Sequence, residues 1–239
     1  MKSGQPPTSA ERQLSIIVPV LNECAGIAAS LQPLQALRAD GVQVIVVDGG
    51  STDETVAIAA PLADLVLQSG AGRGRQMNAG ASQASGAVLL FLHADTRLPL
   101  HADRLILNAL ENGADWGRFD VSIAGSLAGL GMVATMMNWR SRLTGIATGD
   151  QGIFVRRELF WQLGGFPAIA LMEDIVLSSM LRRHARPACL TQRVITSGRR
   201  WEKHGLWRTI FKMWLLRLRF YFGADPERLA REYGYAKTQ

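Results

Sequence analysis

The chain has 239 residues, of which 48% are hydrophobic and 19% charged, and this composition excludes an intrinsically disordered protein. The length allows one domain with a modest extension. The formal net charge of +6 predicts an anionic partner: a nucleotide, a nucleic acid or an acidic membrane surface. The two cysteines exclude a disulfide framework and form no CxxC motif, so we expect a reducing compartment.

The chain begins with a polar segment, residues 1–12, that lacks the basic start and apolar core of a signal peptide. We predict a disordered tail there. Short β-branched runs then alternate with helical spacing, which is typical of a βαβ sheet. Thr52 or Asp53 is expected to cap the helix after the second strand. Strands are predicted at residues 14–20, 42–47, 64–68 and 87–92, a helix at 23–38, and a flexible loop at 70–74.

The second half of the chain is less regular and contains no internal repeat. Strands are predicted at residues 116–123 and 151–156, and helices at 126–143 and from Met172 to about Arg183. Residues 121–139 carry no charge and are numerous enough to cross a bilayer. Their glycines and hydroxyl side chains dilute the hydrophobicity, and a span would separate the flanking motifs. We therefore expect no membrane span.

Two acidic residues follow predicted strands, at the edge of the sheet where open α/β folds bind ligands. Asp48 begins the loop DGGSTD, whose glycines, hydroxyls and carboxylate suit a ribose or a base. Asp95 follows a buried strand and could coordinate Mg²⁺ or Mn²⁺, which prefer oxygen ligands. Each has an ordinary alternative: a strand-to-helix turn for Asp48 and a surface carboxylate for Asp95. Their common edge favours one shared site.

Seven short motifs carry a family resemblance. They are PVLNE from Pro19, DGGSTDET from Asp48, GRGRQMNAG from Gly72, LHAD from Leu92, GDQGIFVRR from Gly149, MED from Met172 and RRW from Arg199. In this order, over about residues 14–205, the chain resembles the family 2 glycosyltransferases with the GT-A fold. It is most similar to small bacterial members with HADT and GDQ signatures, some associated with arsenosugar or selenium-related clusters.

The resemblance implies an α/β fold with a mostly parallel central sheet flanked by helices. It places a GT-A catalytic domain at residues 13–203 and a C-terminal extension of amphipathic helices at 204–239. Asp174 matches the catalytic base, and Asp95 matches the last Asp of the DxD motif, which binds Mg²⁺ or Mn²⁺. A nucleotide-sugar site is implied for Pro19, Asn22, Glu23, Asp48, Gly50, Ser51, Arg73, Arg75, Asn78, His93, Ala94 and Asp95. A diphosphate and acceptor site is implied for Gly149, Asp150, Gln151, Glu173, Arg200 and Trp201.

Two positions depart from the family pattern. Gly49 stands where the family often has a second Asp, so a base or ribose contact is lost or supplied by another residue. His93 stands at the first Asp of the DxD motif, so metal binding rests on Asp95 and on the diphosphate of the donor. His93 itself is interpreted as a structural histidine.

Sugar transfer from a nucleotide diphosphate requires deprotonation of an acceptor hydroxyl and stabilisation of the departing diphosphate. Asp174 could do the first, although helix capping is its alternative role. A metal and the side chains of Arg73, Arg75 and Arg200 could do the second, although loop arginines are often simply solvated. One base without a second nucleophile predicts inversion of the anomeric carbon.

Two other classes of protein compete with this interpretation. A sugar nucleotidyltransferase shares the sheet and the metal crevice, but it usually carries a glycine-rich basic loop after the first strand, where this chain has PVLNE. A membrane- or nucleic-acid-binding module fits the charge but leaves the acidic motifs unused. We therefore expect a UDP- or GDP-type sugar donor and no nucleic acid.

The segment 206–222 predicts an amphipathic helix. Arg208, Lys212 and Arg219 share a face beside bulky aromatic side chains, and Arg217 breaks the pattern. Such a helix suits an anionic membrane interface. The alternative is a helix packed over the catalytic domain with its arginines reaching water. The acceptor is expected to be a small molecule or a lipid, and the protein cytoplasmic, with peripheral attachment to the inner face of the membrane as a hypothesis.

Overall fold

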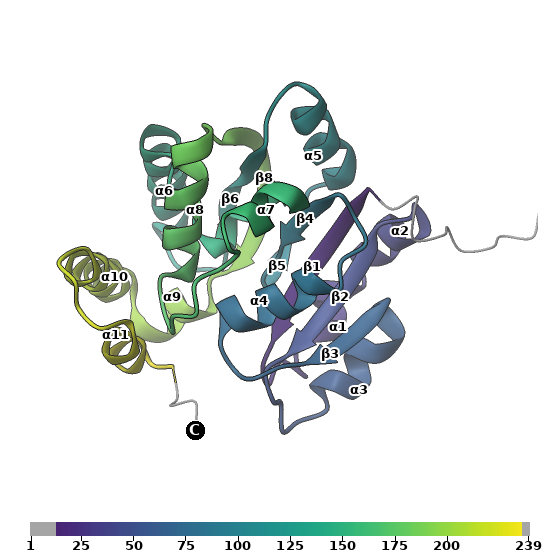
Figure 1. The fold of residues 1–239 in the computed structure, drawn as a ribbon. Coiled ribbons are helices and arrows are strands. Elements are labelled where there is room, and N and C mark those ends of the chain that lie inside the picture. Colours follow the sequence, from purple (N-terminus) through teal and green to yellow (C-terminus); the bar gives the residue numbers. More distant parts are fainter. Residues whose placement is uncertain (1–12, 236–239) are drawn as a thin grey trace, which may run out of the picture.

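The structure, a computed structural model, describes residues 13–235. The tail predicted at 1–12 and the last four residues of the predicted extension lie outside these residues. Within the described chain, eight strands form one sheet in the order β3-β2-β1-β4-β7-β6-β8-β5 (Figure 1). Four of its seven strand pairings are parallel and three are antiparallel, so the sheet is mixed. The predicted α/β class is confirmed.

The first half builds three of the four parallel pairings of the sheet. The four predicted strands appear within two residues of their expected ends, as β1 (Leu14–Val20), β2 (Gln43–Asp48), β3 (Leu65–Gln68) and β4 (Val88–Phe91). The remaining elements are α1 (Ile27–Leu31), α2 (Leu34–Ala39), α3 (Thr55–Ala59), η1 (Ala60–Leu62) and α4 (Arg73–Ser82).

Two predictions for this half are wrong in detail. The helix expected over 23–38 is divided into α1 and α2 at Pro33, whose ring removes a backbone donor. The flexible loop expected at 70–74 ends early, because α4 already begins at Arg73. The side chain of Asp53 accepts a hydrogen bond from the first-turn amide of Thr55 at 3.0 Å, as expected, although the residue at the N-cap position of α3 is Glu54.

The second half adds antiparallel pairings and most of the helices. Its strands are β5 (Thr96–Arg97), β6 (Trp116–Ala124), β7 (Ile153–Arg156) and β8 (Ala188–Ser197). Its helices are α5 (Ala102–Glu111), α6 (Leu130–Thr144), η2 (Gly149–Gln151), α7 (Arg157–Gln162), α8 (Glu173–His184), α9 (Arg199–His204), α10 (Leu206–Tyr221) and α11 (Pro226–Tyr233). The strand β8 was not predicted, and α6 begins four residues later than expected.

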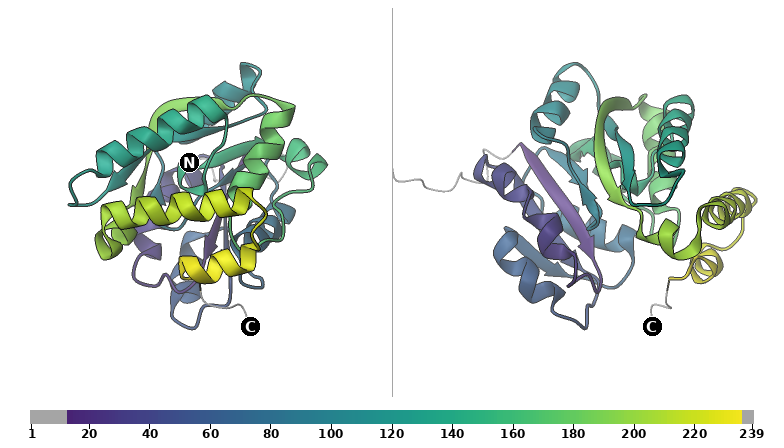
Figure 2. Two further views of the ribbon diagram at one scale, coloured as in Figure 1. Left: turned by 90° about the vertical axis from the view of Figure 1, so that its left-hand side faces the viewer. Right: turned by 180° about the vertical axis from the view of Figure 1, so that it is seen from behind.

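The core lies on both faces of the sheet. Alternate residues of the fully buried β1 point to opposite sides, so Ile16 and Ile17 belong to different apolar clusters. Helices α1, α2, α3, α5 and α6 contribute to one cluster, and α4, α7 and α8 contribute to the other (Figure 2). Covering both faces explains why β1, β2 and β4 read as continuous apolar runs.

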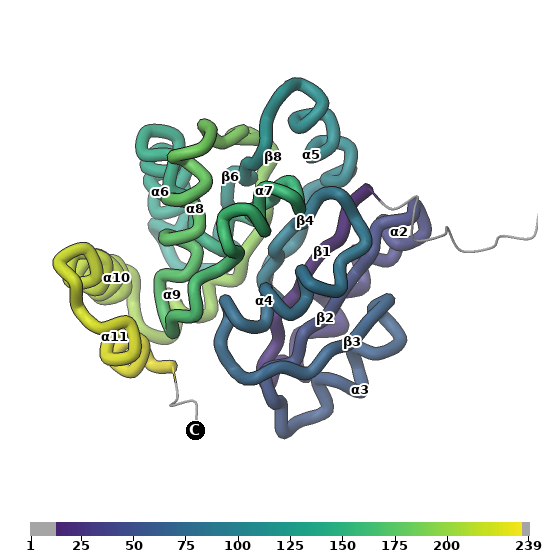
Figure 3. Tube along the Cα trace, in the orientation of Figure 1, coloured from purple at the N-terminus to yellow at the C-terminus, as the bar shows by residue number. Residues whose placement is uncertain are grey.

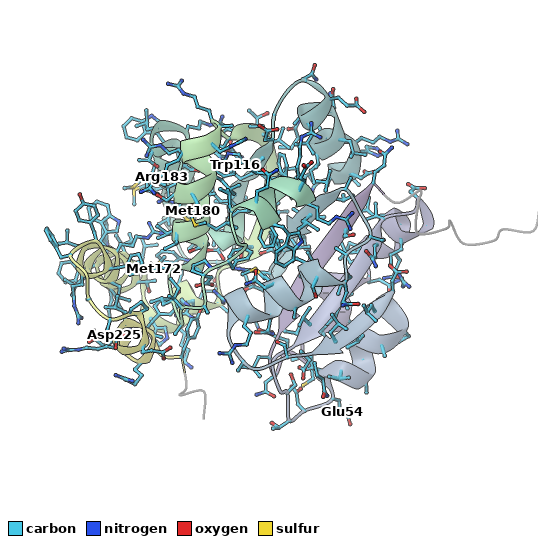
Figure 4. All side chains as sticks on the ribbon, viewed as in Figure 1. Glu54, Trp116, Met172, Met180, Arg183 and Asp225 are labelled. Atoms are coloured by element: carbon cyan, nitrogen blue, oxygen red, sulfur yellow. The ribbon has the colours of Figure 1, made fainter. Side chains whose placement is uncertain are left out.

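The C-terminal helices form a separate apolar cluster with the segment that precedes α8. Leu216 of α10 and Leu229 of α11 pack with Leu171 and Met172, which precede α8. Met172 lies where α8 meets these helices (Figure 4). The pair α10–α11 lies on the side of the molecule away from α2 and α3 (Figure 3). Among residues 13–235, no helix combines the length and the apolar character needed to cross a bilayer.

Candidate active site

A cavity of about 310 Å³ lies between the turn after β4, the start of α8, and the C-terminal helices. Its volume is at the lower end of the range typical of small-molecule sites. Several predicted site residues line it: Glu23, Arg73, His93, Asp95, Asp150, Glu173, Asp174, Arg200 and Trp201. Carboxylates and guanidinium groups therefore face the same hollow, although they come from distant parts of the sequence.

Asp174 is held at the N-terminal end of α8. The Gly149 amide donates to its Oδ2 at 2.7 Å, and the Ile175 amide donates to its Oδ1 at 2.7 Å. Met172, just before this helix, has a left-handed backbone with φ of 72°. Such a conformation is rare for a residue with a long side chain and is enriched at functional sites. The carboxylate of Asp174 is therefore fixed in orientation while it faces the cavity.

His93 and Asp150 meet across the cavity wall. Nδ1 of His93 lies 3.2 Å from Oδ1 of Asp150. Burial opposes ionisation of Asp150, but His93 and the positive charges of Arg73 and Arg217 outweigh it and hold its pKa below the usual value. A Cβ atom at Gly149 would lie 2.3 Å from Nε2 of His93, so only glycine lets the imidazole pack there. These contacts support the structural role predicted for His93.

Asp95 is the candidate metal ligand. It is half-buried, it lines the cavity, and its Oδ1 lies 3.4 Å from the hydroxyl of Thr96. Within residues 13–235, no three His, Cys, Asp or Glu side chains gather as a preformed metal site. A single carboxylate suits a divalent ion whose other ligands are diphosphate oxygens and water, as is common for Mg²⁺.

Asp48 does not line this cavity. Its side chain is fully buried and accepts hydrogen bonds from the Gly50 amide at 3.0 Å and from the amide and hydroxyl of Ser51. Asn22 connects the loop after β1 to the loop after β2, because its Oδ1 accepts a hydrogen bond from the Thr52 amide at 2.9 Å. The carboxylate of Asp48 therefore stabilises the loop that follows β2. We expected Asp48 to line one cavity together with Asp95 and Asp174, and this arrangement is not observed.

Other predicted site residues also have partners outside the cavity. Asn78 exchanges two hydrogen bonds with the backbone of Phe166, at 2.8 and 2.9 Å. Gln151 is fully buried, and its Oε1 accepts from the Thr148 amide at 3.2 Å. The described residues that line the cavity also do not include Pro19, Asn22, Gly50, Ser51, Arg75, Ala94 or Gly149.

The C-terminal segment supplies cavity residues that sequence reasoning missed. The guanidinium of Arg200 lies 4.0 Å from the ring centre of Tyr233, and that of Arg73 lies 5.2 Å from the ring centre of Tyr235. Arg217 of α10 faces the same cavity. Arg217 lies outside the face of α10 that carries the other basic residues, and this position in the sequence could have identified it as a cavity residue. Tyr233 and Tyr235 have no such signal in the sequence, because they reach the cavity only through the turn between α10 and α11.

Glu173 has an unusual electrostatic environment. Its side chain is buried beside Asp174, and burial together with the Asp174 charge raises its pKa to about 7, although Arg73 opposes the shift. The ordinary pKa of a Glu side chain is 4.5. Between pH 4.5 and about 7, Glu173 therefore keeps its proton in the folded protein and has lost it in the unfolded chain. The group therefore stabilises the fold at low pH, and this stabilisation is lost as the pH rises through that window.

We expect Glu173→Gln to flatten the pH dependence of stability. The free energy of unfolding of the wild type should fall by up to about 3 kcal/mol between pH 4.5 and 7 through this group, since one pKa unit corresponds to about 1.4 kcal/mol. Thermal or urea unfolding of both proteins across this pH range measures the difference. Parallel curves for wild type and variant would contradict the assignment.

Solved structures share this architecture. TarS 1–349 of S. aureus in complex with UDP-GlcNAc has a TM-score of 0.61 at 21% identity, covering 77% of this chain and 58% of that one. The mannosyltransferase PcManGT from Pyrobaculum calidifontis, in complex with GDP-Man and Mn²⁺, has a TM-score of 0.56 at 23% identity, covering 79% and 58%. The fold is thus that of the GT-A glycosyltransferases.

Residues 15–164 match the family model described as glycosyl transferase family 2, and the chain belongs to that family. A PGL/p-HBAD biosynthesis glycosyltransferase of Mycobacterium tuberculosis is 38% identical over 96 residues, which cover 37% of this chain and 38% of the relative. The uncharacterized glycosyltransferase YibD of Escherichia coli is 27% identical over 154 residues, covering 59% and 43%. The matched regions thus span less than half of these relatives.

Proposed function

We propose that the chain is an inverting glycosyltransferase that moves a sugar from a nucleotide-diphosphate donor to an acceptor hydroxyl, with Asp174 as general base. The observation that carries this proposal is the cavity shared by Asp174, Asp95 and several arginines. The order of the sequence motifs also supports a place among the small bacterial members of the family with HADT and GDQ signatures.

The charges of the cavity suit a diphosphate. Arg73, Arg199, Arg200 and Arg217 line it together with Asp95. Guanidinium groups stabilise the negative charge that develops on a departing diphosphate, and charge-assisted hydrogen bonds make them strong phosphate ligands. The UDP-GlcNAc and GDP-Man complexes of the structural neighbours support a UDP- or GDP-type donor.

A divalent ion, Mg²⁺ or Mn²⁺, is part of the proposal. When bound, it would neutralise charge on the diphosphate. Asp95 would hold it together with the donor, and the Mn²⁺ in the PcManGT complex supports this assignment. His93 contacts Asp150 instead and would keep the neighbouring turn in place.

Asp174 would remove the proton of the acceptor hydroxyl while the oxygen of that hydroxyl forms a bond to the anomeric carbon. The bond from that carbon to the diphosphate breaks in the same step, and the arginines receive the leaving group. A single displacement from the opposite face inverts the anomeric configuration. The two amides that hold Asp174 would keep its carboxylate oriented during the transfer.

One assay tests the reaction class. The protein is incubated with UDP- and GDP-sugars and Mg²⁺ or Mn²⁺, and the products are identified. We expect the nucleoside diphosphate to be released. Inorganic pyrophosphate would instead indicate a sugar nucleotidyltransferase, and no product with any donor would indicate a binding module.

Peripheral attachment of a cytoplasmic protein to the inner face of an anionic membrane is a second part of the proposal. One face of α10 packs through Thr209 and Leu216, whereas Trp207, Phe211 and Trp214 are exposed. The predicted stripe of basic residues needs one correction, because Arg219 pairs with Glu232 of α11. Arg208 and Lys212 remain exposed beside the aromatic side chains. This combination suits a membrane interface.

We expect Arg208→Glu with Lys212→Glu to weaken binding to anionic liposomes by at least about 30-fold, because each basic residue near the surface contributes about 1 kcal/mol and the introduced carboxylates are repelled. Flotation with phosphatidylserine vesicles measures the bound fraction, and neutral vesicles serve as the control. If the wild type does not float with anionic vesicles, the membrane proposal is wrong.

A further inference from the structure

A second hollow lies beside the candidate active site. It is a groove of about 410 Å³ between α6, α8 and α10. Most of its wall is apolar or uncharged, from Ile146, Ile175, Val176, Phe220 and their neighbours. Ile175 and Arg217 line both this groove and the cavity that contains Asp174. The two hollows therefore share a wall, and the groove runs up to the site of the proposed base.

Two arginines stand in this apolar groove. Arg140 of α6 and Arg217 of α10 both line it. Nε and Nη2 of Arg140 are shielded from solvent and have no hydrogen-bond partner among the described residues. Burial and the charge of Arg217 lower the pKa of Arg140 to about 10, so it stays positive at neutral pH. The Asp174 charge opposes this shift, but it leaves these two nitrogens without an acceptor. Shielded donors without an acceptor are costly, and an anion bound beside them would reduce that cost.

The groove wall includes exposed apolar surface. Tyr221 is 83% exposed at this wall, and Trp139 and Leu143, which lie on α6 but do not line the groove, are each 66% exposed. Exposed apolar residues next to a groove mark binding surface when they are contiguous. The groove thus contains two positively charged side chains, and its wall includes the exposed aromatic ring of Tyr221.

We propose that this groove binds an amphiphile whose anionic group lies at Arg140 and Arg217 and whose apolar chain follows Phe220 and Tyr221 outward. Its role as the acceptor site rests on the proposed glycosyl transfer, because the shared wall places its inner end next to Asp174. The acceptor would then be a lipid-like molecule with a phosphate or carboxylate near the hydroxyl that receives the sugar.

Calorimetric titration of the full chain with octyl phosphate, 1-octanol and inorganic phosphate tests the groove. We expect octyl phosphate to bind at least about tenfold more tightly than octanol, since hydrogen bonds to a charged group contribute about 1.5–3 kcal/mol. Inorganic phosphate should bind at least about 100-fold more weakly than octyl phosphate, because it buries no apolar chain. Equal binding of octyl phosphate and octanol overturns the proposal without any variant.

Variants locate the site. Arg140→Gln should lower the preference for octyl phosphate over octanol, because only Arg217 then faces the anion, and Ser179→Trp, which fills the groove from α8, should weaken both ligands. Arg183→Gln is the matched control, because Arg183 is exposed on the same α8 helix and lies outside the groove lining (Figure 4). If Arg140→Gln binds octyl phosphate as the wild type does, or if Arg183→Gln loses binding equally, the proposal is wrong.

Titrations of the wild type with UDP and with GDP, each in the presence of Mn²⁺, separate this proposal from the proposed function. A protein that binds either nucleotide without preferring octyl phosphate to octanol overturns the groove proposal alone. Selective binding of octyl phosphate without binding of any nucleotide supports the groove and overturns the glycosyltransferase proposal.

Discussion

Asp174→Asn should lower the rate of sugar transfer by about 10²–10⁴-fold, the range that a positioned general base contributes. Asparagine has nearly the same shape and retains an oxygen that can accept from the Gly149 or Ile175 amide, so the fold of the site should persist. It cannot take a proton from the acceptor. Donor affinity, measured by titration with UDP, should stay within about twofold, because the change spares the arginines that face the diphosphate.

A matched control separates catalysis from helix capping. Asp103 also stands in the first turn of a helix, α5, but it does not line the cavity. Asp103→Asn should therefore leave transfer unchanged. A loss below tenfold in Asp174→Asn would refute the assignment of the base. A larger loss in Glu173→Gln than in Asp174→Asn would assign the role to Glu173, whose raised pKa also suits proton transfer near neutral pH.

Asp95→Asn should weaken metal-dependent donor binding by about 10–100-fold. The neutral amide keeps the size of the side chain but removes the negative charge that Asp95 offers to a divalent ion, and contacts with charged groups contribute about 1.5–3 kcal/mol. Because no group of three or more His, Cys, Asp or Glu side chains that could hold a metal ion is found among residues 13–235, the loss should not be compensated by another preformed site. Titration with UDP in the presence of Mn²⁺ gives the affinity.

The same titration in EDTA is the internal control. Without metal, wild type and Asp95→Asn should bind UDP with similar affinity, because the arginines remain. Equal affinities in the presence of Mn²⁺ would contradict the assignment of Asp95 as the metal ligand. A difference that persists in EDTA would indicate a direct contact between Asp95 and the nucleotide.

The strands of the first half could be predicted because their signal is local. Leu14–Val20 is apolar except for Ser15, and Val88–Phe91 is apolar throughout, since both faces of the sheet are covered. The strand β8 escaped prediction because most of its residues are partly or fully exposed and its pattern is irregular. Its pairing with β6 includes a register shift between Phe119 and Asp120, which no local pattern reveals.

The candidate site was predicted only in part, and the reason is long-range packing. Glu173 and Asp174 were found because they begin a helix and match a motif. Asp48 was expected at the site from its place at a strand end, but the direction of its side chain depends on Gly50 and Ser51, which hold it in its own loop. Asn78 and Gln151 likewise have partners that only the folded chain supplies.

The sequence by itself determined the α/β class, the positions of the first four strands along the chain, the family and the residues at the start of α8. These features follow from local hydrophobic periodicity and from short motifs. Only the tertiary structure decided which charged groups share the cavity, because Asp95, Asp174 and Arg217 are far apart in the chain. It also decided that Tyr233 and Tyr235 lie over arginines of the site, since packing of α10 and α11 against Leu171 and Met172 brings the C-terminal segment there.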